Sequence, residues 1–256
     1  MSYILPKPLK VGDTIGVIAP SGPICEQDAI YRAKSFFETM GYQVVFSKHL
    51  FEQDRYLSAP DKARIEDIHW AFSNDEIDTI ICARGGYGAL RLINDIDYNL
   101  IKSNPKNFCG YSDITVLSAM FLKRANLITY SAPMMKGDFG AEKKDKFTMD
   151  SFFKAIINQT QTLVGERIHK EGKAEGVLWG GNLASIVSLA GIDFIPNEDI
   201  IFFAEDLNEP VYKIDKMLTQ LMNIEQFRTN VKGIVFGEFL DTGYPEQLMT
   251  LFDNIA

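Results

Sequence analysis

Cysteine and histidine are both scarce in this 256-residue chain, and their placement argues against metal sites. The three cysteines are odd in number, lie far apart in the sequence and form no C-x-x-C pair; they are Cys25, Cys82 and Cys109. Isolated thiols of this kind are typical of a reducing compartment, so we expect a cytoplasmic protein without disulfides. The three histidines are equally dispersed, and none stands among other metal-ligating residues. The sequence therefore predicts no metal ion, and no motif in it indicates a cofactor.

Long apolar runs and excess positive charge are also missing. No run approaches the roughly 20 apolar residues that a membrane-spanning helix needs. Acidic residues outnumber basic ones by 34 to 26, which gives a net charge of −8. Nucleic acids and anionic membranes attract clustered Lys and Arg, so we expect neither as a partner. The N-terminal "MSYILPKPLKVGD" has no basic stretch followed by an apolar one, so we expect no secretory signal.

What the first 130 residues do contain is an alternation of apolar runs with helical patterns. Buried strands are predicted at 14–20, 42–46, 78–83, 106–110 and 127–130. Helices with one apolar face are predicted between them, at 26–40, 58–72 (with Ser58 as its cap) and 113–124. This alternation predicts an α/β fold, a parallel sheet with helices on both faces. In such sheets ligands bind at the carboxyl ends of the strands.

A second series follows a charged stretch that begins near Gly137. After a helix at 148–158, strands are predicted at 174–179, 200–206 and 231–237, and helices at 183–190, near 211–222 and over the last residues. We therefore expect two domains, an N-terminal α/β domain over 1–160 and a C-terminal domain over 172–256.

Three predicted strands end in loops rich in small residues, at 19–23, 83–88 and 110–113. In a parallel sheet these loops meet at one rim. Adjacent glycines leave backbone N–H groups free to point at an anion or at a developing oxyanion. Tight turns use glycine equally well, so each loop alone has a purely structural interpretation.

Ser112 stands at the junction of a strand and a helix, where a hydroxyl is exposed near a helix N-terminus. A nucleophilic serine is one interpretation. The other is that Ser112 or Asp113 caps the helix over 113–124. The G-x-S-x-G elbow motif is not matched, because Ile114 occupies its last position. Cys109 is expected inside the preceding strand, where buried packing is favoured over a thiol nucleophile.

A serine nucleophile needs a base and a carboxylate that orients it. His49 follows a strand, His69 lies in a helix as a packing residue, and His169 lies in a polar stretch where we expect it to be solvated. Glu205 and Asp206 directly follow the apolar "IIFFA", where a carboxylate is suited to a cleft. Their alternative role is to complement the dipole of the next helix.

Taken together, these residues resemble the LD-carboxypeptidase family of serine peptidases, which includes the microcin C self-immunity hydrolases. Six blocks occur in the family's order: "VGDTIGVIAPSGP" (11–23), "ICARGGYGALRLI" (81–93), "FCGYSDITVL" (108–117), "GVLWGGNLASIVSLAG" (176–191), "IIFFAEDLNEPVYKIDKMLTQL" (200–221) and "VKGIVFGEF" (231–239). Together they span nearly the whole chain, which makes the resemblance far more specific than any one block.

The resemblance implies a flavodoxin-like N-terminal sheet, a smaller β-rich C-terminal domain and a Ser-His-Glu triad that hydrolyses an amide bond. Carried over by motif, Ser112 is the nucleophile and Glu205 is the carboxylate that orients the histidine. The backbone N–H groups of Gly86 and Asp113 form the oxyanion hole. The typical substrate is a murein tetrapeptide, which loses its terminal D-alanine during cell-wall recycling, and the typical assembly is a homodimer.

Three further residues are candidates for binding the substrate. Arg84, beside Gly85 in the 83–88 loop, is suited to a terminal carboxylate, with a surface salt bridge as its alternative. Trp179 is suited to stacking on an adenine if the substrate is a peptidyl or aminoacyl nucleotide, as in the microcin branch. Its alternative is packing at a domain interface.

Two departures from the family pattern qualify this resemblance. The family's catalytic histidine lies in a block well after the glutamate, and none of His49, His69 and His169 matches that block. The segment "TYSAPMM" (129–135) also differs from the family's usual sequence there. We therefore expect either a shortened form of an active enzyme or a pseudoenzyme that binds peptides without cutting them. A sugar- or nucleotide-binding module of the doubly wound type is a third interpretation.

Overall fold

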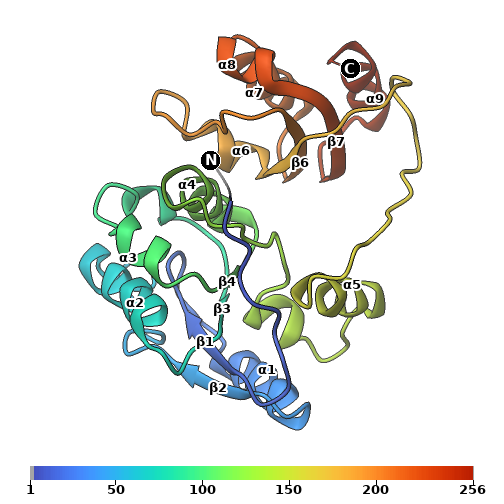
Figure 1. The fold of residues 1–256 in the computed structure, drawn as a ribbon. Coiled ribbons are helices and arrows are strands. Elements are labelled where there is room, and N and C mark those ends of the chain that lie inside the picture. The colour runs from blue at the N-terminus through green and yellow to red at the C-terminus, as the bar shows by residue number, and fades with distance from the viewer. Residues whose placement is uncertain (1–2, 256) are drawn as a thin grey trace. The chain divides into compact units, whose positions relative to one another are not determined.

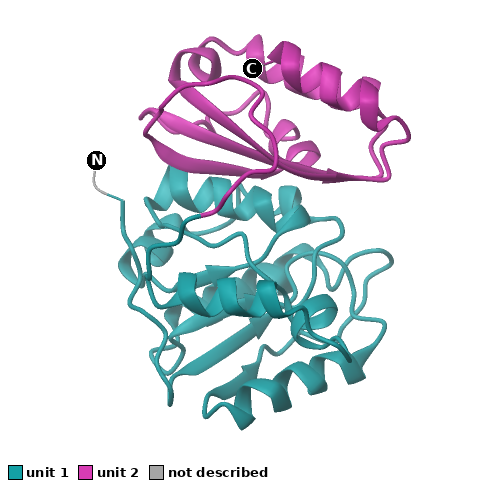
Figure 2. Cartoon of the chain, turned by 90° about the vertical axis from the view of Figure 1, so that its right-hand side faces the viewer, with its two compact units in different colours: residues 1–162 teal, residues 163–256 magenta. Residues whose placement is uncertain are grey.

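The structure is a computed structural model that describes residues 3–255. The chain divides into two compact units, residues 1–162 and residues 163–256, which Figure 2 colours separately. Within the described part of the chain, no helix is both long enough and apolar enough to cross a membrane.

A four-stranded parallel sheet forms the centre of the first unit (Figure 1). Its strands, in spatial order, are β2 (Gln43–Phe46), β1 (Thr14–Ile18), β3 (Thr79–Cys82) and β4 (Asn107–Cys109). This order is that of flavodoxin-like sheets, in which the chain adds strands on one side of β1 and then crosses to its other side, between β1 and β3. The predicted α/β fold with a parallel sheet is confirmed.

Helices and short helical turns cover both faces of this sheet. They are α1 (Gln27–Thr39), α2 (Asp61–Ser73), η1 (Ala89–Arg91), α3 (Tyr98–Ser103), η2 (Ser112–Ile114), α4 (Thr115–Ala125), η3 (Met135–Phe139) and α5 (Lys146–Ile156). Successive strand residues point to opposite faces, and both faces are buried: Ile81 packs in the cluster of α1, η3 and α5, which contains Phe37. On the other face, Phe108 of β4 contacts the rings of Phe72 and Phe121 from α2 and α4. Burial on two sides explains why these strands are continuous apolar runs.

Two predicted elements differ in detail. Ser58 does not cap α2, because its hydroxyl donates to the carbonyl of Ala19 and the helix begins after Pro60. The segment 127–130 forms only isolated bridges, since Leu127 pairs with Ile4 whereas Tyr130 pairs with Cys109. Its partner changes within four residues, so no continuous ladder forms.

The second unit has its own three-stranded parallel sheet, in the order β5 (Val177–Asn182), β6 (Ile200–Leu207) and β7 (Val231–Leu240). The helices of this unit are α6 (Leu183–Val187), α7 (Val211–Met222), α8 (Glu225–Asn230) and α9 (Pro245–Ile255). Alternate residues of β6 are buried, among them Phe202, whose ring contacts Phe227 of α8. A second sheet in the C-terminal region is as predicted.

The aromatic cluster around Phe37 allows a test of the first unit's core. We expect Phe37→Ala to lower the free energy of unfolding by about 3–5 kcal/mol, because it removes a fully buried ring. Phe147→Ala is the control, since that ring is 68% exposed and its loss should change stability by less than about 0.5 kcal/mol. Urea titration followed by circular dichroism measures both, and equal effects of the two substitutions would contradict this description of the core.

Candidate functional site

Three loops meet at the carboxyl ends of β1, β3 and β4 (Figure 1). The backbone N–H of Gly22, after β1, donates to the carbonyl of Gly85, after β3, over 3.2 Å. A Cβ on Gly85 would lie 2.9 Å from the Cβ of Ser112, which follows β4. The convergence predicted for the three loops is therefore present, and it leaves no room for side chains where they touch.

Ser112 has a left-handed backbone conformation, with a φ of 62°, at the sharp turn where η2 begins after β4. A non-glycine residue in this region stores strain, and the nucleophile elbow of serine hydrolases is built on such a turn. Glycine is needed two residues earlier, because a Cβ on Gly110 would lie 2.8 Å from Cγ2 of Ile114. Gly110 therefore supplies the first glycine of the elbow motif, and Ile114 stands in place of the second.

The alternative that Ser112 or Asp113 is merely a helix cap is not supported. Neither η2 nor α4 has a side-chain cap hydrogen bond. The carboxylate of Asp113 turns instead to the loops after β1 and β3, where it accepts from Ser21 and Ala89. The hydroxyl of Ser112 has no hydrogen-bond partner within residues 3–255 and is half-buried.

The proposed oxyanion donors also lack acceptors. Within the described chain, the backbone N–H groups of Gly86 and Asp113 donate to no protein atom. Gly86 has a φ of 125°, a conformation that requires glycine. A Cβ at this position would also lie against the backbone of Gly22. Two free donors beside a free hydroxyl are the arrangement that stabilises a tetrahedral oxyanion. Their catalytic role stays a prediction.

Arg84 is half-buried, and its guanidinium holds the loops together. Its Nε donates to the carbonyl of Gly85 over 3.0 Å, and its Nη1 donates to the carbonyl of Pro23 over 3.1 Å. A guanidinium has five N–H donors, so others remain for a substrate carboxylate. Arg84 and Gly85 stay candidates for substrate binding, and both also have a structural task.

Glu205 belongs to the second unit and lies near the carboxyl end of β6, where it pairs in register with Asn182 of β5. Asp206 takes most of the available donors: it accepts from the Asn182 side chain and from the N–H groups of Ala184 and Leu207. Asp206, rather than Glu205, therefore accepts a hydrogen bond from a backbone N–H at the N-terminus of α6. Among the described atoms, Oε1 of Glu205 is buried and accepts no hydrogen bond.

The acidity of Glu205 reflects this environment. The pKa of its carboxyl is raised from 4.5 to about 7, chiefly by burial and also by the nearby charge of Asp206, while a hydrogen bond with Asn182 acts in the opposite direction. A buried carboxyl with an unpaired oxygen is suited to a cationic or N–H-donating partner, because such a partner would favour the charged form. An imidazole is one such group.

Each of the three histidines already has a local partner. Nδ1 of His49 lies 2.7 Å from a carboxylate oxygen of Glu52, and Nε2 of His69 accepts from the N–H of Asp97. The prediction that His169 is solvated is wrong, because its ring is 14% exposed and Nδ1 lies 2.7 Å from Asp253. Edge-to-face contacts with Phe236 and Phe252 further immobilise that ring.

Two other predicted residues lie in apolar interiors. Trp179 is 4% exposed, and its ring contacts Phe194, Phe202 and Phe227 within the second unit. Packing in that unit's aromatic core therefore replaces both stacking on a nucleotide and packing at a domain interface. Cys109 is fully buried, and burial raises the pKa of its thiol, so the expected packing role is confirmed.

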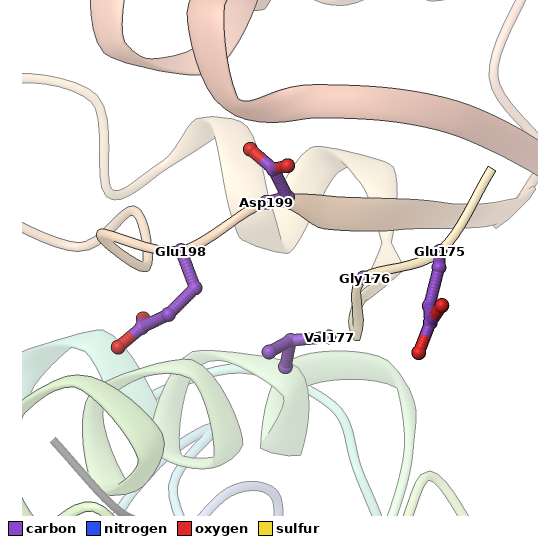
Figure 3. A pocket seen from close by; sticks show the side chains of 5 residues that line it. All are labelled: Glu175, Gly176, Val177, Glu198 and Asp199. Atoms are coloured by element: carbon purple, nitrogen blue, oxygen red, sulfur yellow. The ribbon is translucent and has the colours of Figure 1, made fainter.

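Figure 3 shows a hollow in the second unit that is lined by Glu175, Gly176, Val177, Glu198 and Asp199. It lies at the amino ends of β5 and β6, whereas Glu205 lies near the carboxyl end of β6. Three of its lining side chains are carboxylates, and none is a serine, a cysteine or a histidine. The hollow is therefore not the candidate site.

Sequence reasoning missed two residues, one in each unit, that contact the candidate residues. Ser21 is fully buried and bonds Asp113 from the loop after β1, and Asn182 bonds Asp206 while its oxygen accepts from the N–H of Ser185. Both stand in quoted motifs, "APSGP" and "GGNL", but a lone Ser or Asn beside glycines is also typical of a turn.

Comparison with known proteins decides the family. The LD-carboxypeptidase N-terminal domain matches residues 15–132, and the LD-carboxypeptidase C-terminal domain matches residues 175–254. The probable murein peptide carboxypeptidase of Bacillus subtilis is 39% identical over 240 residues, which cover 91% of this chain and 74% of the relative. The chain belongs to the LD-carboxypeptidase family.

Solved structures of LD-carboxypeptidase relatives agree with this assignment. The MccF-like protein of Bacillus anthracis superposes with a TM-score of 0.89 at 31% identity and covers 98% of this chain and 86% of its own. The muramoyltetrapeptide carboxypeptidase of Oxalobacter formigenes has a TM-score of 0.81 at 29% identity and covers 93% of this chain and 82% of its own. The protein is accordingly a serine hydrolase of the carboxypeptidase type.

The raised pKa of Glu205 predicts a pH-dependent stability. The neutral carboxyl is favoured in the folded state, so its stabilisation is complete below pH 4.5 and is lost as the pH rises through about 7. We expect Glu205→Gln to be more stable than the wild type by about 1–3 kcal/mol at pH 8 and equal to it at pH 4. Urea titrations at both pH values measure this, with the exposed Asp199→Asn as control. The same difference at both pH values would show that the Glu205 carboxyl does not titrate as described.

The contact between Gly85 and Ser112 predicts that even one methyl group is harmful. Gly85→Ala should displace the hydroxyl and reduce the rate of labelling of Ser112 by a fluorophosphonate by about 10²-fold, because reactive geometry is lost. Gly137→Ala is the control, since a Cβ there meets nothing nearer than 3.9 Å. Equal labelling rates of the two variants would contradict the close contact.

Proposed function

We propose that this protein is a serine carboxypeptidase that removes the terminal D-alanine from a muropeptide tetrapeptide, by hydrolysing the amide that follows an L-configured centre. The observation that carries the proposal is the left-handed turn at Ser112, which leaves an unpaired hydroxyl against Gly85 and close in sequence to the free N–H of Asp113. The family relatives named for murein peptides supply the substrate class.

The proposed mechanism proceeds through an acyl-enzyme. The oxygen of Ser112 attacks the carbonyl carbon while a base accepts the hydroxyl proton. The N–H groups of Gly86 and Asp113 donate to the oxyanion of the tetrahedral intermediate. The base then gives the proton to the departing amine of D-alanine, and an attacking water repeats the sequence to release the shortened peptide.

In this mechanism Glu205 orients the imidazole of the base. A cationic imidazolium beside its unpaired oxygen would lower the pKa of the Glu205 carboxyl and keep it ionised near neutral pH. The contacts of His49, His69 and His169 with other groups make none of them a ready candidate. The family resemblance implies a histidine as the base, in a motif that none of these three histidines matches.

Substrate recognition needs a cation for the terminal carboxylate. Arg84 is proposed for this task, because two of its N–H groups position it on backbone carbonyls and others remain free to donate. A cytoplasmic location and a homodimer are further parts of the proposal that rest on the family resemblance.

Cleavage of a tetrapeptide tests the main proposal. The protein is incubated with a muropeptide tetrapeptide, and mass spectrometry should show loss of one D-alanine. Ser112→Ala should lower that rate by about 10⁴–10⁶-fold, because the nucleophile is removed. Loss of D-alanine that persists at the wild-type rate in Ser112→Ala would exclude the mechanism.

Hydrolysis of an aminoacyl nucleotide amide is a second candidate, favoured by the close superposition on the MccF-like protein. The burial of Trp179 weakens it, because no face of that ring is free for an adenine. Incubation with an aminoacyl sulfamoyl adenosine beside the tetrapeptide separates the two activities. Binding of the tetrapeptide without cleavage of either compound would instead identify a peptide-binding pseudoenzyme.

A further inference from the structure

A buried polar contact lies behind the turn that carries Ser112. Oδ2 of Asp113 accepts from the hydroxyl of Ser21 over 2.5 Å and from the backbone N–H of Ala89 over 2.9 Å. Ser21 is fully buried in the loop after β1, and Ala89 opens η1, at the end of the loop after β3. One carboxylate oxygen thus joins all three loops of the candidate site.

This contact lies next to the groups that carry the proposed chemistry, so a small shift of its atoms would also move those groups. Asp113 directly follows Ser112, and its own N–H is one of the two proposed oxyanion donors. Ala89 lies three residues after Gly86, the other proposed donor. A movement of the Asp113 side chain therefore changes the relative positions of the hydroxyl and both donors.

A buried arginine supports the same arrangement. Arg64 is 1% exposed, and its Nη1 donates to the carbonyl of Pro20 over 2.6 Å and to that of Gly88 over 3.0 Å, which ties the same two loops. Burial raises the pKa of the Asp113 carboxyl, whereas the donors from Ser21 and Ala89 and the positive charge of Arg64 lower it. A carboxylate with this many donors is costly to bury for stability alone, because a well-packed apolar group is often equally stable.

We propose that the side chain of Asp113 is a positioning residue for the nucleophile and the oxyanion hole, and that Ser21 is its partner. The inference deepens the proposed function and rests on it. Asp113 and Ser21 touch no reacting atom, and they act by fixing where Ser112, Gly86 and the Asp113 N–H lie. Preorganised donors of this kind contribute most to rate when they cannot move.

The chain contains a matched control for this cluster. Asp67 of α2 is also a buried aspartate whose carboxylate accepts from a serine hydroxyl, Ser47 at 2.7 Å, and from a backbone N–H, that of His49 at 3.3 Å. Burial raises its pKa as well. This contact joins α2 to the loop after β2, so it shares the chemistry of the Asp113 contact without its connection to Ser112.

The test compares the two clusters in protein that cleaves the tetrapeptide. We expect Asp113→Ala to lower kcat by about 10²-fold with little change in KM, since misplaced groups affect the transition state more than binding. Asp113→Asn should recover most of that loss, because an amide oxygen can still accept from Ala89. Asp67→Ala should lower the melting temperature by a similar amount and leave kcat within about twofold. Ser21→Ala and Ser47→Ala repeat the comparison with a smaller change.

The outcomes separate the inference from the function on which it rests. A kcat for Asp113→Ala no lower than that for Asp67→Ala would overturn the positioning role. If the wild type cleaves nothing, the proposed function fails, and crystal structures of the variants then decide the inference alone. The expected result is that Asp113→Ala moves Ser112 and the Gly86 N–H while Asp67→Ala does not; unmoved loops in Asp113→Ala would refute it.

Discussion

The geometry of the site depends on one steric constraint, the close approach of Ser112 to positions that carry no side chain. The left-handed turn at Ser112 brings its Cβ against Gly85, and the same turn packs Ile114 onto Gly110. A methyl group at either glycine would force the elbow open. Functional sites retain such unfavourable backbone conformations because the surrounding structure holds them in place.

Two buried acidic groups, one in each unit, differ in the hydrogen-bond donors that surround them. Asp113 is surrounded by donors from Ser21 and Ala89, so its charge serves to hold loops in place. Glu205 lies beside Asp206, which takes the available donors and leaves one oxygen of Glu205 buried without a partner. The carboxylate of Asp113 already accepts hydrogen bonds from its neighbours, whereas that of Glu205 has an oxygen that can still accept one from another group. This contrast agrees with the proposed roles, in which Asp113 positions the loops and Glu205 orients an imidazole.

Much of the fold follows from periodicity, because burial on both faces of a parallel sheet produces continuous apolar runs. The strands β1, β3 and β6 coincide with such runs. Details that depend on distant partners were not predictable: Ser58 bonds the carbonyl of Ala19 instead of capping α2, and His169 is held by Asp253 and two rings of the C-terminal elements. Trp179 was predicted to stack on an adenine or to pack at a domain interface, whereas its ring lies in an aromatic core. In each case the deciding contact comes from residues far away in the sequence.

Local apolar patterns alone are enough to place Ser112, Gly86 and Glu205 at or shortly after the ends of buried runs. The convergence of the loops after β1, β3 and β4 also followed, because parallel strands share one carboxyl edge. Three features depend on the folded chain: Ser112 adopts a positive φ, Asp113 bonds Ser21 across 92 residues of sequence, and Glu205 keeps an unpaired oxygen. Hydrogen-bond partners and steric contacts are distributed in space, and a linear pattern carries no measure of those distances.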